Sequence, residues 1–362
     1  MIHTEKVKAN PLITPAMVKP SNPEMEVVGV FNAGVTTYQE ETILLLRIAE
    51  KVKNQPQGHV LVPIINSKNQ VEIQTLDKKA LQNVLDFNDS RVIRRQHAHP
   101  KGGVAWLSTL SHFRIARSRD GIHFSIDPKP TIFPDGLYEC WGIEDPRITK
   151  MDDHYCILYT SVSHIGITVS LMTTKDFLSF QRQGIVLPPE NKDAVLFPEK
   201  VNGKYVMYHR PVPGGIGGLN IWSSTSLDLI HWGQHQLVLT TTDSGFENGR
   251  IGAGVPPIKT SEGWLSLYHA ATSNNVYSMS AFLTSLDNPH RVIKKLNVPL
   301  ISADLPFEKE GFFNHVVFAC GCVHKEDTLW VYYGAADQSI ALAKISLNDI
   351  MKALQPYETH KY

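Results

Sequence analysis

WGIEDPRITKMDDHYCILY, the stretch from Trp141 to Tyr159, is the part of the chain from which the fold can be worked out. It places Glu144, Asp145 and Arg147 in one short segment around Pro146. Proline holds φ at about −65° and lacks a backbone donor, so a helix cannot continue through it. The residue before a proline is pushed to an extended conformation. Asp145 is therefore predicted at a strand end or turn, ahead of an alternating strand over residues 154–161.

Two carboxylates and a guanidinium at the mouth of a sheet admit two interpretations. They can form a buried ion pair that ties two strands together, or they can belong to a polar functional site. The pattern of the rest of the chain favours the second interpretation.

Composition excludes several classes of function. The chain has 362 residues with 35 basic and 35 acidic side chains and is 42% hydrophobic, as in ordinary soluble proteins. Zero net charge argues against nucleic-acid or membrane-surface binding driven by bulk charge. No apolar run reaches the roughly 18 residues of a membrane span, and the N-terminus lacks a signal-like apolar segment. The four cysteines form no disulfide or metal motif, so a cytoplasmic location is expected.

Units built like the opening stretch recur along the chain. Each has a turn, often with proline, then a strand ending in aromatic residues, then a second strand and a turn that usually carries an aspartate. After a first unit near Val27, they begin near Asp145, Phe197, Val255 and Cys322. A period of roughly 50 to 65 residues with about four short strands per unit is typical of a β-propeller.

The predicted fold is therefore all-β: a five-bladed β-propeller with a few short helices. The propeller is assigned to residues 27–362, and the proline-rich residues 1–26 are interpreted as an irregular N-terminal arm. Helices are expected over residues 77–88 and 346–354, the latter with Ser346 as N-cap. A two-sheet sandwich is the structural alternative, but it does not explain a repeat of whole units.

In a propeller the inner strands surround one axial channel, so residues at matching positions of different repeats converge there. Polar groups in a narrow channel cost several kcal/mol unless they are paired or used, and this favours a functional set. The matching positions carry Asn32, Arg47, Glu144, Asp145, Arg147, Lys192, His209, Arg210, Tyr268, His269, Tyr333 and Asp337. Arg91, Arg94 and Arg95 are interpreted as a solvated or partner-binding face, and residues 214–218 as a flexible loop over the channel mouth.

Five motifs in order give the chain a family resemblance: SRDGIHF (118–124), GIEDPRIT (142–149), LFPEK (196–200), GVPPI (254–258) and YYGAAD (332–337). Together they resemble glycoside hydrolase family 130. The resemblance implies a five-bladed propeller acting on β-mannosides. Most family members are inverting phosphorylases that use phosphate to release α-mannose 1-phosphate, and some are hydrolases. The single catalytic acid of the family matches Asp145, so the resemblance implies that Asp145 protonates the scissile oxygen through the 3-hydroxyl of the bound mannose.

The two reactions have different requirements opposite Asp145. An inverting hydrolase needs a second carboxylate about 6.5 to 9.5 Å away to activate water. Phosphate is already an anionic nucleophile and needs a cationic seat. The resemblance implies phosphate binding by Lys192 and His269, with Arg210 and Tyr268 as weaker candidates, and this favours a phosphorylase. Residues 161–166 lack an arginine that some members carry there, so another basic residue, for example among residues 91–95, would have to substitute.

The remaining candidates are assigned to the sugar: Asn32, Arg47, Glu144, Arg147 and Asp337. A β-1,2 linkage is favoured, with the loops at residues 90–101 and 211–218 contacting the acceptor. The alternatives are a β-1,4-mannoside phosphorylase, a β-mannoside hydrolase and a non-catalytic sugar-binding propeller. Inorganic phosphate is expected as a co-substrate, without cofactor or metal. The expected partners are a small oligosaccharide and phosphate, without nucleic acid or membrane, and a homo-oligomer is compatible with the sequence.

Overall fold

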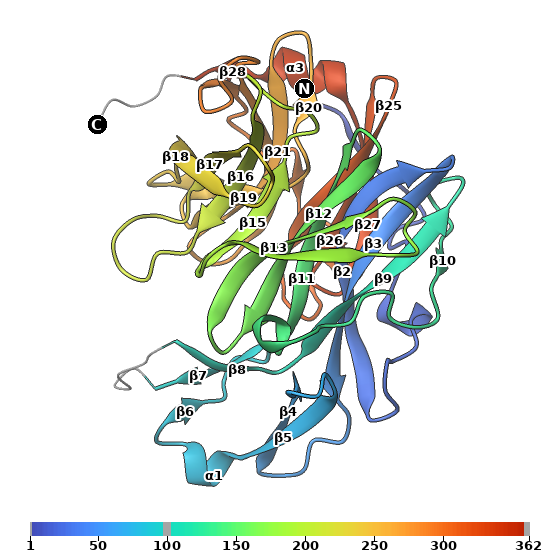
Figure 1. The fold of residues 1–362 in the computed structure, drawn as a ribbon, viewed down its shortest axis with the longest axis vertical. Helices are drawn as coiled ribbons and strands as arrows, with labels where there is room; N and C mark the ends of the chain where they lie inside the picture. The colour runs from blue at the N-terminus through green and yellow to red at the C-terminus, as the bar shows by residue number, and fades with distance from the viewer. Residues whose placement is uncertain (1, 97–102, 358–362) are drawn as a thin grey trace.

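The computed structural model describes residues 2–96 and 103–357, and it contains five antiparallel sheets that follow one another along the chain (Figure 1). Sheet 1 consists of β2 (Met25–Tyr38), β3 (Glu41–Val52), β9 (Leu110–Ser118) and β10 (Ser125–Ile126). Sheet 2 consists of β11 (Gly142–Met151), β12 (His154–Ser163), β13 (Gly166–Thr174) and β14 (Gln181–Leu187). Sheet 3 consists of β15 (Asn191–Leu196), β16 (Tyr205–Pro211), β17 (Ile221–Ser226) and β18 (Trp232–Leu239).

Sheets 4 and 5 complete the series. Sheet 4 consists of β19 (Arg250–Ala253), β20 (Ile258–Lys259), β21 (Trp264–Ala271), β22 (Tyr277–Thr284), β23 (Val292–Lys295), β24 (Ile301–Ser302) and β28 (Gln355–Pro356). Sheet 5 consists of β25 (Val317–Lys325), β26 (Thr328–Ala335), β27 (Ser339–Ser346) and β1 (Thr4–Lys6). The helical turns are η1 (Pro15–Met17), η2 (Leu137–Glu139), η3 (Gly245–Glu247), α2 (Pro306–Lys309) and α3 (Leu347–Ala353). The prediction of an all-β fold with a few short helices is confirmed.

The core lies between consecutive sheets. Because the strands alternate, each sheet presents apolar side chains on both faces, and five buried clusters fill the spaces between them. The clusters include Phe113 with Ile148 between sheets 1 and 2, Leu158 with Met207 between sheets 2 and 3, Tyr208 with Tyr268 between sheets 3 and 4, Leu267 with Val331 between sheets 4 and 5, and Tyr332 with Leu44 between sheets 5 and 1. Each large side chain buried in this way contributes about 1.5 to 3 kcal/mol.

The first strands of the sheets, here called the inner strands, pack against one another. β2 contacts β11 and β25, β11 contacts β15, and β15 contacts β19. Residues at the starts of these strands, although distant in sequence, are therefore brought close together, as the repeat argument requires.

The N-terminal arm is not irregular throughout. Thr4–Lys6 pairs with residues 343–345 of β27, so this strand is the outer edge of sheet 5. The prediction is wrong for this strand because three residues are too few to show an alternating pattern, and the pairing forms across the whole length of the chain.

An insertion between β3 and β9 was not foreseen. It contains a hairpin of β4 (His59–Ile65) and β5 (Val71–Asp77), the turn α1 (Lys78–Leu81), and a small sheet of β6 (Leu85–Asp86), β7 (Val92–Arg95) and β8 (Val104–Leu107). Figure 1 shows this insertion below the five sheets.

The two predicted helices have different outcomes. The helix expected over residues 77–88 is wrong beyond Leu81: Asp77 caps a single turn, and Leu85 then pairs with Arg95 in a strand. An isolated helix of about twelve residues is marginal in water, so strand pairing prevails. The C-terminal helix is confirmed, with the Ser346 hydroxyl accepting a hydrogen bond from the Asp349 amide at 3.1 Å.

Candidate active site

A cavity of about 450 Å³ opens where the inner strands of the sheets meet the insertion. Six cationic side chains and four carboxylates line it among the described residues. The cations are Arg47, Arg91, Arg94, Lys192, Arg210 and Arg250, and the acids are Glu144, Asp145, Asp193 and Asp337. The cavity therefore carries an excess of positive charge.

One backbone device is repeated in three inner strands. Each strand has a β-bulge at the same place: after Phe31 in β2, after Glu144 in β11 and after Lys192 in β15. The next residue has a positive φ in each case, 48° for Asn32, 48° for Asp145 and 54° for Asp193. Asparagine and aspartate tolerate this conformation better than most residues, and bulges re-aim side chains next to active sites.

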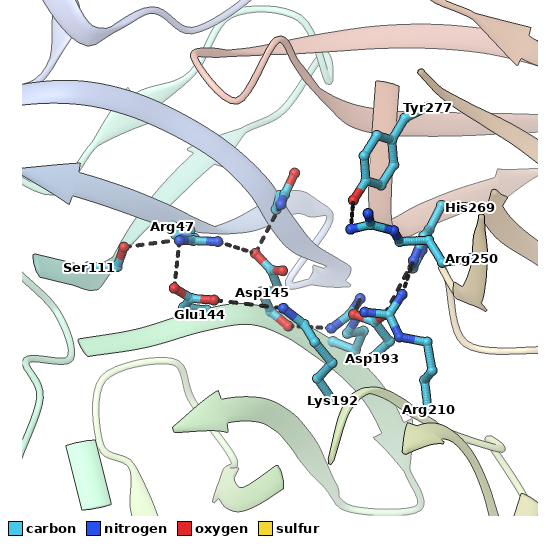
Figure 2. Close-up of polar contacts among 12 residues, drawn as sticks. Arg47, Ser111, Glu144, Asp145, Lys192, Asp193, Arg210, Arg250, His269 and Tyr277 are labelled. Atoms are coloured by element: carbon cyan, nitrogen blue, oxygen red, sulfur yellow. Dashed lines mark hydrogen bonds and ion pairs between the residues drawn. The ribbon is translucent and has the colours of Figure 1, made fainter. Parts of the chain in front are cut away.

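Asp145 is held from the side of sheet 1 (Figure 2). Its Oδ1 accepts hydrogen bonds of 2.9 Å from Asn32 Nδ2 and 2.9 Å from Arg47 Nη1. Arg47 also donates to Glu144 Oε1 at 2.8 Å and to Ser111 Oγ at 3.1 Å. Burial opposes ionisation of Asp145, but Arg47, Lys192 and Arg147 together hold the pKa of its carboxyl below its ordinary value.

Asp193 is held by two arginines and a histidine on the opposite side. Its carboxylate lies 2.8 Å from Arg210 Nη1, 3.3 Å from Arg147 Nη2 and 3.2 Å from His269 Nε2. Burial opposes its ionisation too, yet these neighbours hold the pKa of the Asp193 carboxyl well below its usual range. Burial lowers the pKa of His269 to about 4, so its imidazole is neutral at pH 7.

Lys192 lies between the two groups. Its Nζ is 4.0 Å from Glu144 Oε2, and its side chain is 21% exposed, facing the cavity. At that distance the ammonium is only loosely paired and is available to an anion in the cavity.

Arg250 and Tyr277 also line the cavity, and the sequence analysis missed both. Arg250 Nη1 donates to the Tyr277 hydroxyl at 3.0 Å, and its other terminal nitrogen donates to Asn275. The available signal was the position of Arg250, the first residue of an inner strand after an Asn-Gly turn. The Arg250 guanidinium lies on the same side of the site as Arg210 and His269 (Figure 2).

Asp337 lines the cavity beside these groups. Burial raises the pKa of its carboxyl to about 6, partly offset by Arg47 and reinforced by Asp145. Of the acids in the cavity whose pKa is shifted, it is the one that holds a proton most readily near neutral pH.

The structure brings most of the expected residues together, but not all. Asn32, Arg47, Glu144, Lys192, Arg210, His269 and Asp337 line the cavity with Asp145. Arg147 lies below it, donating to the Asp145 carbonyl oxygen at 2.9 Å and pairing with Asp193, so it supports the bulges and does not line the cavity. His209 and Tyr333 are buried outside the cavity lining.

Tyr268 does not belong to the site. Its hydroxyl donates to Glu247, which also pairs with Lys295 at 2.5 Å, and its ring lies in the core between sheets 3 and 4. Successive residues of a strand point to opposite faces, so His269 faces the cavity and Tyr268 cannot. The expectation that Tyr268 contacts phosphate is wrong for this reason.

The basic cluster of the insertion is divided between two surfaces. Arg91 and Arg94 line the cavity, whereas Arg95 does not. The Arg91 guanidinium lies 3.6 Å from the centre of the Phe313 ring, which links the insertion to the loop ahead of β25. The interpretation as a solvated or partner-binding face is incomplete for both: Arg91 is partly buried, Arg94 is half exposed, and both line the cavity while pairing with Asp89. They can supply the charge missing at residues 161–166.

The acceptor loops are described in part. Residues 97–101 of the first loop lie outside the described residues. In the second, Val212 and Leu219 line the cavity on either side of the glycine-rich segment. Within the described part of the chain, no cluster of His, Cys, Asp and Glu has the arrangement of a metal site, and no helix could span a membrane.

Comparisons with known proteins agree on one family. The family model for glycoside hydrolase family 130, described as beta-1,4-mannooligosaccharide phosphorylase, matches residues 105–356. The chain is 43% identical to a beta-1,2-mannobiose phosphorylase of Listeria innocua over 97% of this chain and 98% of that one. It is 42% identical to a 1,2-beta-oligomannan phosphorylase of Thermoanaerobacter over 67% of this chain and 80% of the relative.

A solved structure matches over nearly the whole length. The Listeria innocua beta-1,2-mannobiose phosphorylase in complex with beta-1,2-mannobiose superposes with a TM-score of 0.93, covering 97% of this chain and 98% of that one. Sequence, family model and structure lead to the same conclusion: the chain belongs to glycoside hydrolase family 130.

Proposed function

We propose that this protein is an inverting β-mannoside phosphorylase. It cleaves β-1,2-mannobiose and longer β-1,2-linked mannooligosaccharides with inorganic phosphate and releases α-mannose 1-phosphate. The β-1,2 linkage is supported by the Listeria relative, which aligns along almost the full length of both chains, insertion included.

The observation that carries this proposal is the charge of the cavity opposite Asp145. Six cations and four carboxylates line it, and Asp89, just outside the lining, pairs with Arg91 and Arg94, so the cavity keeps a positive excess. A phosphate dianion neutralises that excess, and guanidinium groups match its oxygens with pairs of hydrogen bonds. A hydrolase would need a free carboxylate to activate water. Glu144 is paired with Arg47, and Asp193 is enclosed by Arg147, Arg210 and His269, so Asp337 is the lining carboxylate whose role the phosphate-dependence test below decides.

The residues divide into three roles in this proposal. Asp145 is the general acid. Lys192, Arg210, Arg250 and His269 bind phosphate, with Arg91 or Arg94 as a further cation. Asn32, Arg47, Glu144 and Asp337 bind the mannosyl unit, and Arg147 supports Asp145 and Asp193 from below.

Phosphate and the catalytic proton are coupled in this arrangement. The free protein holds Asp145 ionised at neutral pH, because nearby cations depress the pKa of its carboxyl. A dianion beside Lys192 offsets part of that positive field and raises the pKa of Asp145. Phosphate binding therefore promotes protonation of the acid, which passes its proton to the leaving oxygen through the 3-hydroxyl of the mannose.

The fold proposed for this chemistry is a five-bladed β-propeller formed by the five sheets. Its support is the cycle of contacts: clusters between each sheet and the next, and a further cluster between sheets 5 and 1. The β1 strand, which joins the N-terminus to the last sheet, is consistent with such a closure. A cytoplasmic location and a homo-oligomeric state stay predictions.

The test is incubation of the purified protein with β-1,2- and β-1,4-mannobiose, each with and without phosphate. The proposal expects mannose 1-phosphate and mannose from the β-1,2 sugar only when phosphate is present. Equal release of mannose without phosphate would identify a hydrolase. Faster phosphorolysis of the β-1,4 sugar would identify the β-1,4-specific alternative, and the anomer of the product checks inversion.

A further inference from the structure

A second cavity lies on the other side of the insertion from the catalytic one. It has a volume of about 560 Å³ and is formed where β4, β7 and β8 meet sheet 2. Volumes of this size, at an interface between structural units, are typical of small-molecule sites. None of the residues assigned above to the mannosyl unit, to phosphate or to proton transfer lines it.

The two cavities share their walls. Along β8, Val104 and Leu107 line the catalytic cavity, while Ala105 and Trp106 line the second one. At the β12–β13 turn, Val162 and Ile167 line the first and His164 the second.

Aromatic rings form one side of the second cavity. The ring centres of Trp106 and Trp141 are 5.9 Å apart with an interplanar angle of 37°, and the His164 ring is 6.4 Å from that of Trp141. Trp141 is buried and fixed by its amide, which donates to the Val162 carbonyl oxygen at 2.9 Å, whereas Trp106 is partly exposed. The apolar faces of indole rings pack against the C–H faces of pyranose rings, and such packing needs no charge.

Polar groups without negative charge surround the rings. They are Asn66, Ser67, Asn69, Arg95 and His164, and no carboxylate lines the cavity among the described residues. The Arg95 Nη1 already donates to the Val104 carbonyl oxygen at 2.7 Å. With one guanidinium engaged by the main chain, the cavity is poorly suited to an anion such as phosphate. Asn66 Oδ1 accepts from the Lys68 and Gln70 amides, and Asn69 is engaged by Asp135 and Gly136. Within the described residues, the Asn66 amide nitrogen, the Ser67 hydroxyl and His164 Nε2 are left to bind neutral hydroxyls.

We propose that this second cavity is a non-catalytic sugar-binding site, which takes a mannosyl unit of the same β-mannosides. The identity of the sugar rests on the proposed function, while the existence of a neutral-sugar site rests on the aromatic rings and their polar rim. A concave site lined by one buried and one partly exposed indole suits a single sugar ring better than the flat face of a second protein copy.

The tryptophans provide a direct test, because the chain has six and none of them lines the catalytic cavity. Protein labelled with 5-fluorotryptophan is titrated with β-1,2-mannobiose in phosphate-free buffer and followed by fluorine NMR, with the Trp106 signal assigned from Trp106→Phe. We expect the Trp106 signal to shift and saturate on a curve of its own, while that of Trp330, on the outer part of sheet 5, stays in place. His164→Ala should raise the half-saturation concentration about 5-fold.

Three results would overturn the proposal. The Trp106 signal could stay in place while calorimetry of Asp145→Asn shows the catalytic cavity filling. The Trp106 signal could follow the saturation curve of the catalytic cavity in both the parent protein and His164→Ala. The Trp106 ring would then sense binding in the catalytic cavity and not in the second one. The signal could instead shift with protein concentration in the absence of sugar, which would identify a self-association surface. If the protein fails to phosphorolyse mannobiose but a neutral sugar still moves the Trp106 signal, the proposed function fails and the second site stands.

Discussion

Asp145 and Asp193 occupy the same position in two neighbouring sheets. Each follows a bulge in an inner strand, each has a positive φ, and each is almost fully buried, at 3% and 1% exposure. Their partners differ. Asp145 has one cation in direct contact, Arg47, and an amide from Asn32, whereas Asp193 is enclosed by Arg147, Arg210 and His269.

The comparison teaches that the bulge places a carboxylate and that the side chains packed around it, from its own sheet and from its neighbours, decide its use. Arg147 and Arg210 flank the Asp193 carboxylate and, with His269, hold its pKa well below the usual range, so it stays ionised near neutral pH. Its negative charge instead keeps the cations together in a buried place that would otherwise be costly. Asp145, bound on one oxygen, can still take up a proton and donate it.

The largest effect is expected from Asp145→Asn. Asparagine tolerates the positive φ and keeps the size of the side chain, but it cannot donate the catalytic proton. Loss of a general acid lowers kcat by about 10²- to 10⁴-fold, measured as mannose 1-phosphate formation at saturating phosphate. Phosphate binding by calorimetry should persist. Near-normal turnover in this variant would show that Asp145 is not the acid.

Asp193→Asn is expected to affect stability and phosphate binding more than the chemical step. Removing one member of a buried charge cluster leaves its partners uncompensated and costs about 3 to 5 kcal/mol. We expect a lower free energy of unfolding in urea and a higher KM for phosphate, with a smaller loss of kcat than in Asp145→Asn. Added phosphate should stabilise the variant more than the parent protein, because the anion replaces part of the lost charge. If stability is unchanged and only kcat falls, Asp193 takes part in the chemistry and the comparison is wrong.

Asp337 provides a test that uses pH, because the pKa of its carboxyl is raised whereas those of Asp145 and Asp193 are lowered. Its folded-state pKa of about 6 lies above the ordinary value of 3.8. The folded protein therefore binds an extra proton between those values and loses stability as pH rises through them. Asp337→Asn removes that loss, so its stability relative to the parent should increase between about pH 4 and pH 6 and then level off. Because the side chain is partly open to the cavity, the change is roughly 1 to 2 kcal/mol.

Urea unfolding at pH 5 and pH 7 measures this difference. The pKa of Asp145 is depressed, so in Asp145→Asn the relative stability should not change between these two pH values. If the relative stability of both variants changed in the same way between pH 5 and pH 7, the cations around Arg47 would not give Asp145 and Asp337 different pKa values.

The repeat explains how much of the site the sequence could reveal. Glu144 and Lys192 occupy matching places in their units, so pattern alone brought them to one cavity that the structure also forms. The sequence pattern could not show which of Tyr268 and His269 faces the cavity. Both faces of this buried strand carry side chains that are either apolar or hydrogen-bonded, so neither face stands out. There, a one-residue difference decides between core and cavity.

Other features leave little trace in the sequence. β1 is only three residues long, and its partner lies at the far end of the chain. The insertion carries short strands whose pairing depends on tertiary contacts, so Arg91 and Arg94 were read as surface residues. The glycine-free bulges were invisible because Asn32, Asp145 and Asp193 adopt a positive φ without a glycine to mark it.

The comparison between Asp145 and Asp193 extends to the residue that precedes each of them. Glu144 and Lys192 hold equivalent positions ahead of the bulge, with opposite charge and 4.0 Å between their charged atoms. Among the described residues, this loose contact is the one ion pair of Lys192. Lys192→Ala should therefore leave stability nearly unchanged while raising the KM for phosphate about 10-fold, the effect of losing one charged hydrogen bond. Lys259→Ala, which removes an exposed lysine paired with Glu199, is the matched control and should change neither quantity. If Lys192→Ala lowered kcat without raising that KM, the lysine would act on Asp145 and not on phosphate, and the division between an acid side and an anion side of the cavity would have to be abandoned.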